Sequence, residues 1–280
     1  MWKQKIGISA GGLHGLEASD FTELLARTGF DAISPGYRAK EELDTLIDEA
    51  RKRGLAIQSI HAPYTKSAHM WRDDPECAKI AVDELIAVLE SCARHEVPIM
   101  VCHTWIGFDY PDVPGETGFK NYKTVIDRAR ELGVKVALEN TEGEEFLFAL
   151  LDRFGDEECV GFCWDSGHEM CYNHSEDLLG KYGDKLLLTH LNDNLGISRF
   201  DGKTFWTDDL HLLPFDGIAD WRYNTERLKK CPRLDILNLE LSIGSKPHRH
   251  DNDVYAAMKL EVYYAEAYKR ACRIANMYLN

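Results

Sequence analysis

The chain has 280 residues, of which 44% are hydrophobic and 29% charged, a composition that is ordinary for a globular protein with a sizeable core. Its formal net charge of −14 argues against nucleic acid as a partner, because non-specific nucleic-acid binding depends on Lys and Arg neutralising phosphates. The sequence has no apolar run of the roughly 18 residues that a membrane span needs, no signal-peptide pattern and eight singly scattered cysteines, so we expect a cytoplasmic protein with no membrane contact.

Short apolar runs alternate along the chain with longer segments of helical period, which is typical of βα units and a parallel sheet. The expected elements, in chain order, are strand 6–9, helix 18–28, strand 32–35, helix 40–53, strand 56–62, helix 77–95, strand 99–104, helix 119–132, strand 135–140, helix 144–154, strand 160–165, helix 175–182, strand 186–191, helix 219–230, strand 234–241 and helix 254–277. Gly54 and Gly133 stand directly after two of these helices, where a C-terminal glycine is expected. Eight consecutive units predict a single-domain α/β fold over residues 1–280, a (β/α)8 TIM barrel, with an open doubly wound sheet as the alternative.

Six of the eight expected strands finish, at or within a residue of the end, with a side chain that can bind a metal. These six are His61, His103, Glu139, Asp165, His190 and Glu240. A charge at the end of a buried parallel strand is costly without a partner. In a barrel these ends converge on the mouth, where the catalytic residues of this architecture lie. Six nitrogen and oxygen donors in one cavity would repel one another or stay unsatisfied, so the pattern predicts a divalent metal.

Three further residues extend this set. His168 follows Asp165 by three positions, and Asp209 and His211 lie in the long loop after the seventh strand. They could supply another metal position, or His168 and His211 could contact substrate hydroxyls, and ligand chemistry alone leaves both readings open.

Four more residues are candidates for substrate contact. Residues two apart on a strand share a face, so Asn192 accompanies His190 and Asn238 accompanies Glu240 toward the mouth. Both amides could hold substrate hydroxyls or orient metal ligands. Tyr64 and Trp105 could form apolar walls for a sugar, the alternative being ordinary loop packing.

Five runs of the sequence carry a family resemblance: His-Ala-Pro-Tyr, Leu-Glu-Asn-Thr-Glu-Gly, Trp-Asp-Ser-Gly-His, His-Leu-Asn-Asp and Asp-Leu-His-Leu-Leu-Pro-Phe-Asp-Gly. In order and approximate spacing they resemble the xylose isomerase-like TIM-barrel superfamily, over essentially the full chain. That superfamily includes sugar isomerases, ketose 3-epimerases, inosose dehydratases and endonuclease IV. Similarity to the epimerase branch implies a metal held by Glu139, Asp165, His190 and Glu240, with Glu139 and Glu240 also serving as the catalytic acid/base pair. Similarity to endonuclease IV implies that nine residues are zinc ligands, namely His61, His103, Glu139, Asp165, His168, His190, Asp209, His211 and Glu240. The two branches together imply a divalent metal, Zn or Mn, with one to three ions.

The resemblance implies an enzyme. We expect a metal-dependent isomerase or epimerase of a sugar, sugar phosphate or polyol that transfers protons through a metal-stabilised enediolate. The alternative is an endonuclease IV-like multi-zinc phosphodiesterase, against which the acidic charge balance argues, and a third interpretation is a binding barrel without turnover. No clear match exists for the substrate-clamping arginine of ketose epimerases. The expected partner is a small carbohydrate, and formation of a homo-oligomer stays open.

Overall fold

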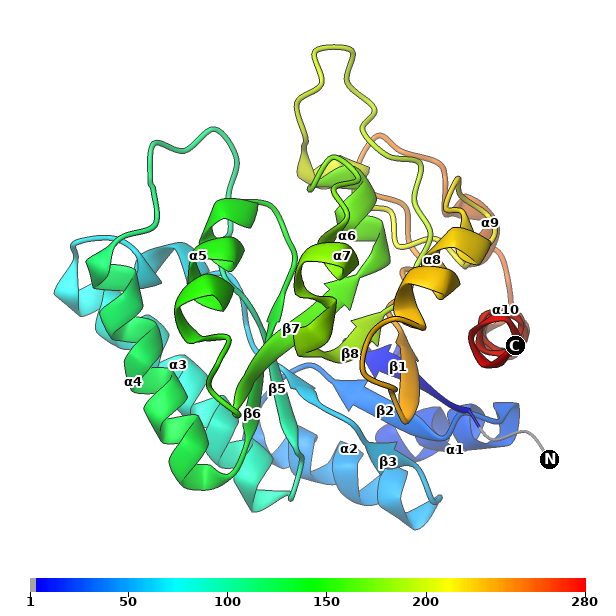
Figure 1. Cartoon of the computed structure of the whole chain (residues 1–280). Helices are drawn as coiled ribbons and strands as arrows, with labels where there is room; N and C mark the ends of the chain where they lie inside the picture. The colour runs from blue at the N-terminus through cyan, green and yellow to red at the C-terminus, as the bar shows by residue number, and fades with distance from the viewer. Residues whose placement is uncertain (1–3) are drawn as a thin grey trace.

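The computed structural model describes residues 4–280, in which a ring of strands is enclosed by helices (Figure 1). The strands are β1 Lys5–Ala10, β2 Ala32–Pro35, β3 Ala56–Ile57, β4 Ile60–His61, β5 Ile99–His103, β6 Lys135–Glu139, β7 Val160–Asp165, β8 Leu186–His190 and β9 Ile236–Leu239. The helices are α1 Ala18–Thr28, α2 Lys40–Lys52, α3 Pro75–Arg94, α4 Glu116–Leu132, α5 Glu144–Phe154, α6 Ser166–Cys171, α7 Leu178–Tyr182, α8 Trp221–Leu228, α9 Asp253–Ala256 and α10 Leu260–Leu279. Short 3-10 turns lie at Ser67–Met70, Gly183–Lys185 and Trp206–Asp208.

The strands pair in parallel and close into a barrel. They form two sheets, in the orders β3-β2-β1-β9 and β4-β5-β6-β7-β8. Isolated parallel bridges join the two sheets, one between Gly36 and His61 and the other between Leu191 and Leu239. The ring is therefore complete, which confirms the predicted TIM barrel and excludes the open sheet.

The third barrel position differs from the expected single strand 56–62. Its first half, β3, pairs with β2, whereas its second half, β4, pairs with β5. The chain changes partner at Gln58 and Ser59, so this position belongs to both sheets and the strand is interrupted there. This change also brings His61 to the same edge as the end of β5.

Five helical predictions differ from the structure by two or more residues. Two of them differ only at their ends, because α4 begins at Glu116 instead of 119 and α8 covers Trp221–Leu228 instead of 219–230. The expected helix 175–182 begins later, at Leu178, and an additional helix, α6, fills the turn directly after β7. The expected helix 254–277 is divided into α9 and α10 by a short break at residues 257–259. The helix α3 begins at Pro75, two residues earlier than expected, because the Asp74 side chain accepts a hydrogen bond from the backbone N–H of Cys77 and proline suits the first helical position.

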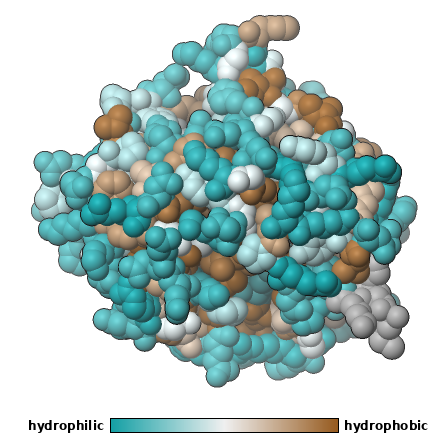
Figure 2. All heavy atoms as spheres, in the orientation of Figure 1, coloured by the Kyte–Doolittle hydropathy of each residue, from teal (hydrophilic) through white to brown (hydrophobic). Residues whose placement is uncertain are grey.

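Strand register places the candidate ligands at one height of the barrel. Within the sheet, His103 stands beside Glu139, and Asp165 stands beside His190. The strand residues before them are almost fully buried, as expected for strands covered on both faces. None of the helices in residues 4–280 is long and apolar enough to cross a membrane. The face seen in Figure 2 is covered mostly by hydrophilic residues, with apolar ones scattered between them.

Candidate metal centre

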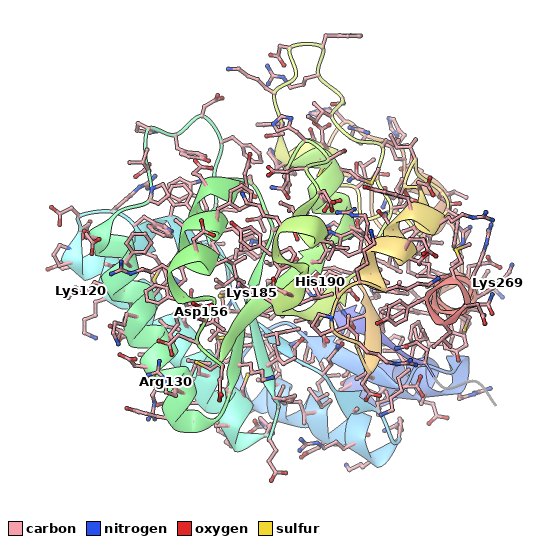
Figure 3. All side chains as sticks on the ribbon, in the orientation of Figure 1. Lys120, Arg130, Asp156, Lys185, His190 and Lys269 are labelled. Atoms are coloured by element: carbon pink, nitrogen blue, oxygen red, sulfur yellow. The ribbon has the colours of Figure 1, made fainter. Side chains whose placement is uncertain are left out.

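All nine candidate ligands lie at one mouth of the barrel. Six of them end or directly follow strands: His61, His103, Glu139, Asp165, His190 and Glu240. His168 lies in the first turn of α6, and Asp209 and His211 come from the long loop between β8 and α8. The side chain of His190 lies near the middle of the molecule, among the strands (Figure 3). The structure therefore gathers side chains from segments that are far apart in the sequence.

Glu139 is the centre of this cluster and is fully buried. Its Oε2 atom lies 3.0 Å from His61 Nε2 and 3.3 Å from His103 Nε2. Its other oxygen, Oε1, lies 2.8 Å from His190 Nδ1. His61, His103 and Glu139 thus form a first group of potential metal ligands, which we call a donor group, and the other oxygen of Glu139 faces a second donor group.

The second donor group consists of Glu139, Asp165, His190 and Glu240, whose ligand atoms lie within 4.8 Å of one another. Glu240 Oε2 lies 2.9 Å from His190 Nδ1. Asp165 is held in place through both oxygens, because Oδ1 accepts the backbone N–H of His168 at 2.7 Å and Oδ2 accepts Asn192 Nδ2 at 2.8 Å. These contacts orient the carboxylate before any ion binds.

The third donor group contains His168 and His211. With Asp165 their ligand atoms also lie within 4.8 Å of one another. Asp209 Oδ1 adds a further donor, 2.8 Å from His211 Nε2 and 3.4 Å from His168 Nε2. The Nδ1 atom of His211 lies 3.1 Å from the backbone carbonyl of Glu240, which leaves Nε2 facing the cluster.

The protonation of these groups is strongly shifted by their packing. Burial opposes ionisation of Glu139, yet the surrounding histidines hold its pKa well below the ordinary value. Burial also opposes ionisation of Glu240, but His190 lowers the pKa of Glu240 to about 2. Burial raises the pKa of Asp165 to about 6. Burial disfavours the charged form of His211, but Asp209 beside it raises the pKa of His211 to about 9. In the metal-free protein, protons on histidines therefore balance the carboxylates, and a bound cation would replace those protons.

The chemistry of the cluster suits a divalent metal. Imidazole nitrogens and carboxylate oxygens are ligands for Zn and Mn. Two buried atoms in or beside the cluster have no hydrogen-bond partner among residues 4–280, namely His103 Nδ1 and Asn192 Oδ1. Buried polar atoms are normally paired, so these unpaired atoms are consistent with a group that would complete the site.

A cavity of about 970 Å³ opens above the cluster. Its wall includes the candidate ligands His61, His103, His168, Asp209, His211 and Glu240. Tyr64 also lines it, with its ring stacked on His103 at a centroid distance of 4.6 Å. Glu139 does not line the cavity, so a substrate would meet Glu240 and not Glu139.

The structure places three of the expected substrate contacts elsewhere. Trp105 is fully buried and stacks on Phe146 with ring centroids 4.2 Å apart, so it packs in the core and forms no cavity wall. Asn238 is also fully buried and donates to Ser9 Oγ inside the barrel. Asn192 does not line the cavity but donates a hydrogen bond to Asp165. This contact agrees with the expected role of orienting a metal ligand and not with binding a substrate hydroxyl. Their side-chain directions depend on packing partners that strand parity alone does not reveal.

Sequence reasoning missed other residues of this site. Lys246 lines the cavity and forms an ion pair with Asp209 at 3.0 Å. Phe108 and Tyr172 add aromatic wall, with ring centroids 5.8 Å apart. Lys246 follows Glu240 by six residues, in the loop after a barrel strand. Binding residues of a TIM barrel are expected in such loops, so the position of Lys246 in the sequence could have marked it as a candidate.

Comparison with known proteins agrees with the architecture. A family profile described as "Xylose isomerase-like TIM barrel" matches residues 22–272. The chain belongs to this family. The match agrees with the TIM barrel that the strands form.

Two curated relatives align with part of the chain. The uncharacterised protein y4fM of Sinorhizobium fredii is 31% identical over 163 residues, which cover 55% of this chain and 49% of that protein. A probable endonuclease 4 of Cenarchaeum symbiosum is 27% identical over 177 residues, which cover 58% of this chain and 61% of that protein. The chain thus matches about half of the first relative and three-fifths of the second.

Solved structures share the whole fold at low sequence identity. D-psicose 3-epimerase with D-tagatose from Clostridium cellulolyticum H10 superposes with a TM-score of 0.73 and 16% identity, over 98% of this chain and 99% of the other. The IOLI protein with a binding zinc atom also gives a TM-score of 0.73, with 19% identity over the same shares of the two chains. At this identity the likeness concerns the fold.

Proposed function

We propose that the chain is a metal-dependent isomerase or epimerase that acts on a sugar, sugar phosphate or related polyol. The observation that carries the proposal is the position of Glu240, which belongs to the same donor group as the buried Glu139, Asp165 and His190 and also lines the cavity. A group in this position can contact the reacting carbon of a substrate whose oxygens lie beside the donor group. Epimerases among the structures that share the fold support the same class of reaction.

A divalent ion held by Glu139, Asp165, His190 and Glu240 would supply Lewis-acid stabilisation of the negative charge that develops on a carbonyl oxygen, worth several kcal/mol. The protein contributes the proton transfer. The side chain of Glu240 is 24% exposed on the cavity wall, so its carboxylate can reach a proton on a bound substrate. Glu139 is enclosed by three histidines, so we now assign it to metal binding and no longer to the acid/base pair.

Of the two glutamates expected to form the acid/base pair, Glu240 lines the cavity and Glu139 does not, which favours chemistry on one face of the substrate. A 1,2-isomerisation can use one base that moves a proton between neighbouring carbons. An epimerisation needs a second proton donor on the opposite face, and His168 and His211 are the imidazoles on the cavity wall that could provide it.

The cavity suits a substrate with little negative charge. Within residues 4–280, Lys246 is the one lysine or arginine on its wall, where it stands with Glu142, Asp209 and Glu240. A nucleic-acid backbone would require several such cations. Tyr64, Tyr172 and Trp206 add aromatic surface suited to a sugar chain or ring.

A multi-zinc phosphodiesterase is the second candidate function. It is favoured by the three adjoining donor groups and by the partial match to a probable endonuclease 4. In that case the ions would activate water and bind phosphoryl oxygens.

Deuterium exchange distinguishes these functions. The metal-loaded protein would be incubated in D2O with ketoses, aldoses and inososes, and NMR would follow deuterium entering the carbon next to the carbonyl. We expect exchange with at least one substrate class and none with Glu240→Gln. Absence of exchange on the whole panel, together with cleavage of abasic DNA or of a small phosphodiester, would reverse the ranking of the two functions.

A further inference from the structure

Asp209 divides its two oxygens between different positive groups. Oδ1 faces the imidazoles of His168 and His211, whereas Oδ2 lies 3.0 Å from Lys246 Nζ. The Asp209 side chain is 11% exposed and that of Lys246 24% exposed, so the pair is shielded from water. Attraction between such charges is stronger than on an open surface.

The loop that carries Lys246 is fixed against the loop that carries Asp209. Asn252 Nδ2 donates to the carbonyls of Leu210, at 3.0 Å, and Ser242, at 2.8 Å. Arg249 Nη1 adds an ion pair with the buried Asp208 at 3.1 Å. On the other side of Lys246, the backbone N–H of Ser242 donates to the carbonyl of His211 at 3.0 Å, so the loop that carries Lys246 is joined to the Asp209 loop both before and after this residue.

The charge of the cluster limits how many ions it can hold. Four carboxylates contribute four negative charges when ionised, and histidines are neutral when they bind metal. Two divalent ions would balance these carboxylates. A third ion would leave two excess positive charges directly beside the ammonium group of Lys246.

We propose that Lys246 acts as the resident cation of the third donor group, so that the cluster holds two divalent ions and not three. The ammonium group neutralises Asp209 and repels an ion at His168 and His211. The two ions occupy the positions that share Glu139. His168 and His211 then remain free to donate or accept protons at the substrate, a consequence that rests on the proposed function, whereas the ion count does not.

The test compares the metal content of matched variants of the full chain. Wild type, Lys246→Met and Lys246→Arg would be equilibrated with Zn²⁺ at buffered free concentrations and their bound zinc measured by elemental analysis. Met keeps most of the side-chain volume without the charge, and Arg keeps the charge. Lys203→Met is the control. Lys203 lies in the long loop that also carries Asp209, but it forms an exposed ion pair with Asp109, at 3.4 Å, away from the cluster.

We expect two zinc ions in the wild type, the Lys246→Arg variant and the Lys203→Met control. Lys246→Met should bind a third ion at least about tenfold more tightly than the wild type does. Three tightly bound ions in the wild type, an unchanged zinc isotherm in Lys246→Met, or a third ion gained equally by Lys246→Arg would each show that the proposal is wrong. Zinc binding is read without substrate, so a failed exchange assay would affect the proposed function and leave this result intact.

Discussion

Replacing Gly167 by alanine tests whether Asn192 positions the ligand Asp165. Gly167 lies in α6, and a Cβ atom built on it would stand 1.9 Å from Asn192 Oδ1 and 2.9 Å from Asn192 Cγ. Heavy atoms cannot approach so closely, so Asn192 must move. Its hydrogen bond to Asp165 Oδ2, now 2.8 Å long, would then be lost or distorted.

Two opposing effects decide how the Gly167→Ala substitution changes the free energy of folding. Alanine is favoured over glycine inside a helix by about 1 kcal/mol. Loss of a hydrogen bond to a charged group costs about 1.5–3 kcal/mol, and the displaced amide is fully buried, which adds to the cost. The loss outweighs the gain. Disturbing a residue that orients a metal ligand lowers metal affinity about 10–100-fold, which is the effect we expect for Gly167→Ala.

The assay is competition for Zn²⁺ between the protein and a chelator of known affinity, with a thermal melt of each metal-free variant. Gly115→Ala is the matched control, because Gly115 has an extended backbone and the nearest atom to its added Cβ would be 4.0 Å away. The control should keep wild-type affinity. A Gly167→Ala protein that melts normally and binds zinc within twofold of the wild type would refute the role assigned to Asn192.

Three shorter predictions address the chemistry of the site. Glu240→Gln should lower kcat by about 10²–10⁴-fold and shift the melting temperature by only a few degrees, and near-normal turnover would remove the proton-transfer assignment. Because Asp209 raises the pKa of His211 to about 9 in the metal-free protein, an ion that uses His211 must displace a proton. In the Lys246→Met variant, which is expected to accept an ion there, metal affinity at this position should therefore fall by about tenfold for each pH unit below 9. A flat affinity profile in chelator competition between pH 6 and 8 would contradict this prediction. Binding to abasic duplex DNA at physiological salt should be negligible, whereas tight binding that weakens steeply with salt would favour the phosphodiesterase.

Much of the architecture could be predicted because the signals are local. The expected helices 18–28 and 144–154 and strands 32–35 and 160–165 have the observed bounds, since each is a compact apolar pattern ended by glycine, proline or charge. The ligands were visible for a related reason. Parallel strands are buried, so a histidine or carboxylate at the end of one stands out, and register then brings such residues together.

The remaining features depend on contacts between distant segments. The division of strand 56–62 arises where its halves pair with different sheets, which no local pattern records. Trp105 enters the core because Phe146, on another helix, offers a stacking partner. Three histidines from other strands enclose Glu139, and this arrangement supports the proposal that Glu139 binds metal instead of transferring protons. The role of Lys246 likewise depends on how two long loops pack against each other.

Anomalous diffraction at the zinc and manganese absorption edges, from crystals of protein purified without chelator, tests the central claim most directly. We expect a peak at about 2.0–2.2 Å from donor atoms of Glu139, Asp165, His190 and Glu240, with these residues converging on a single ion. Metal-free density at this position in protein that catalyses its reaction at full rate would contradict the account.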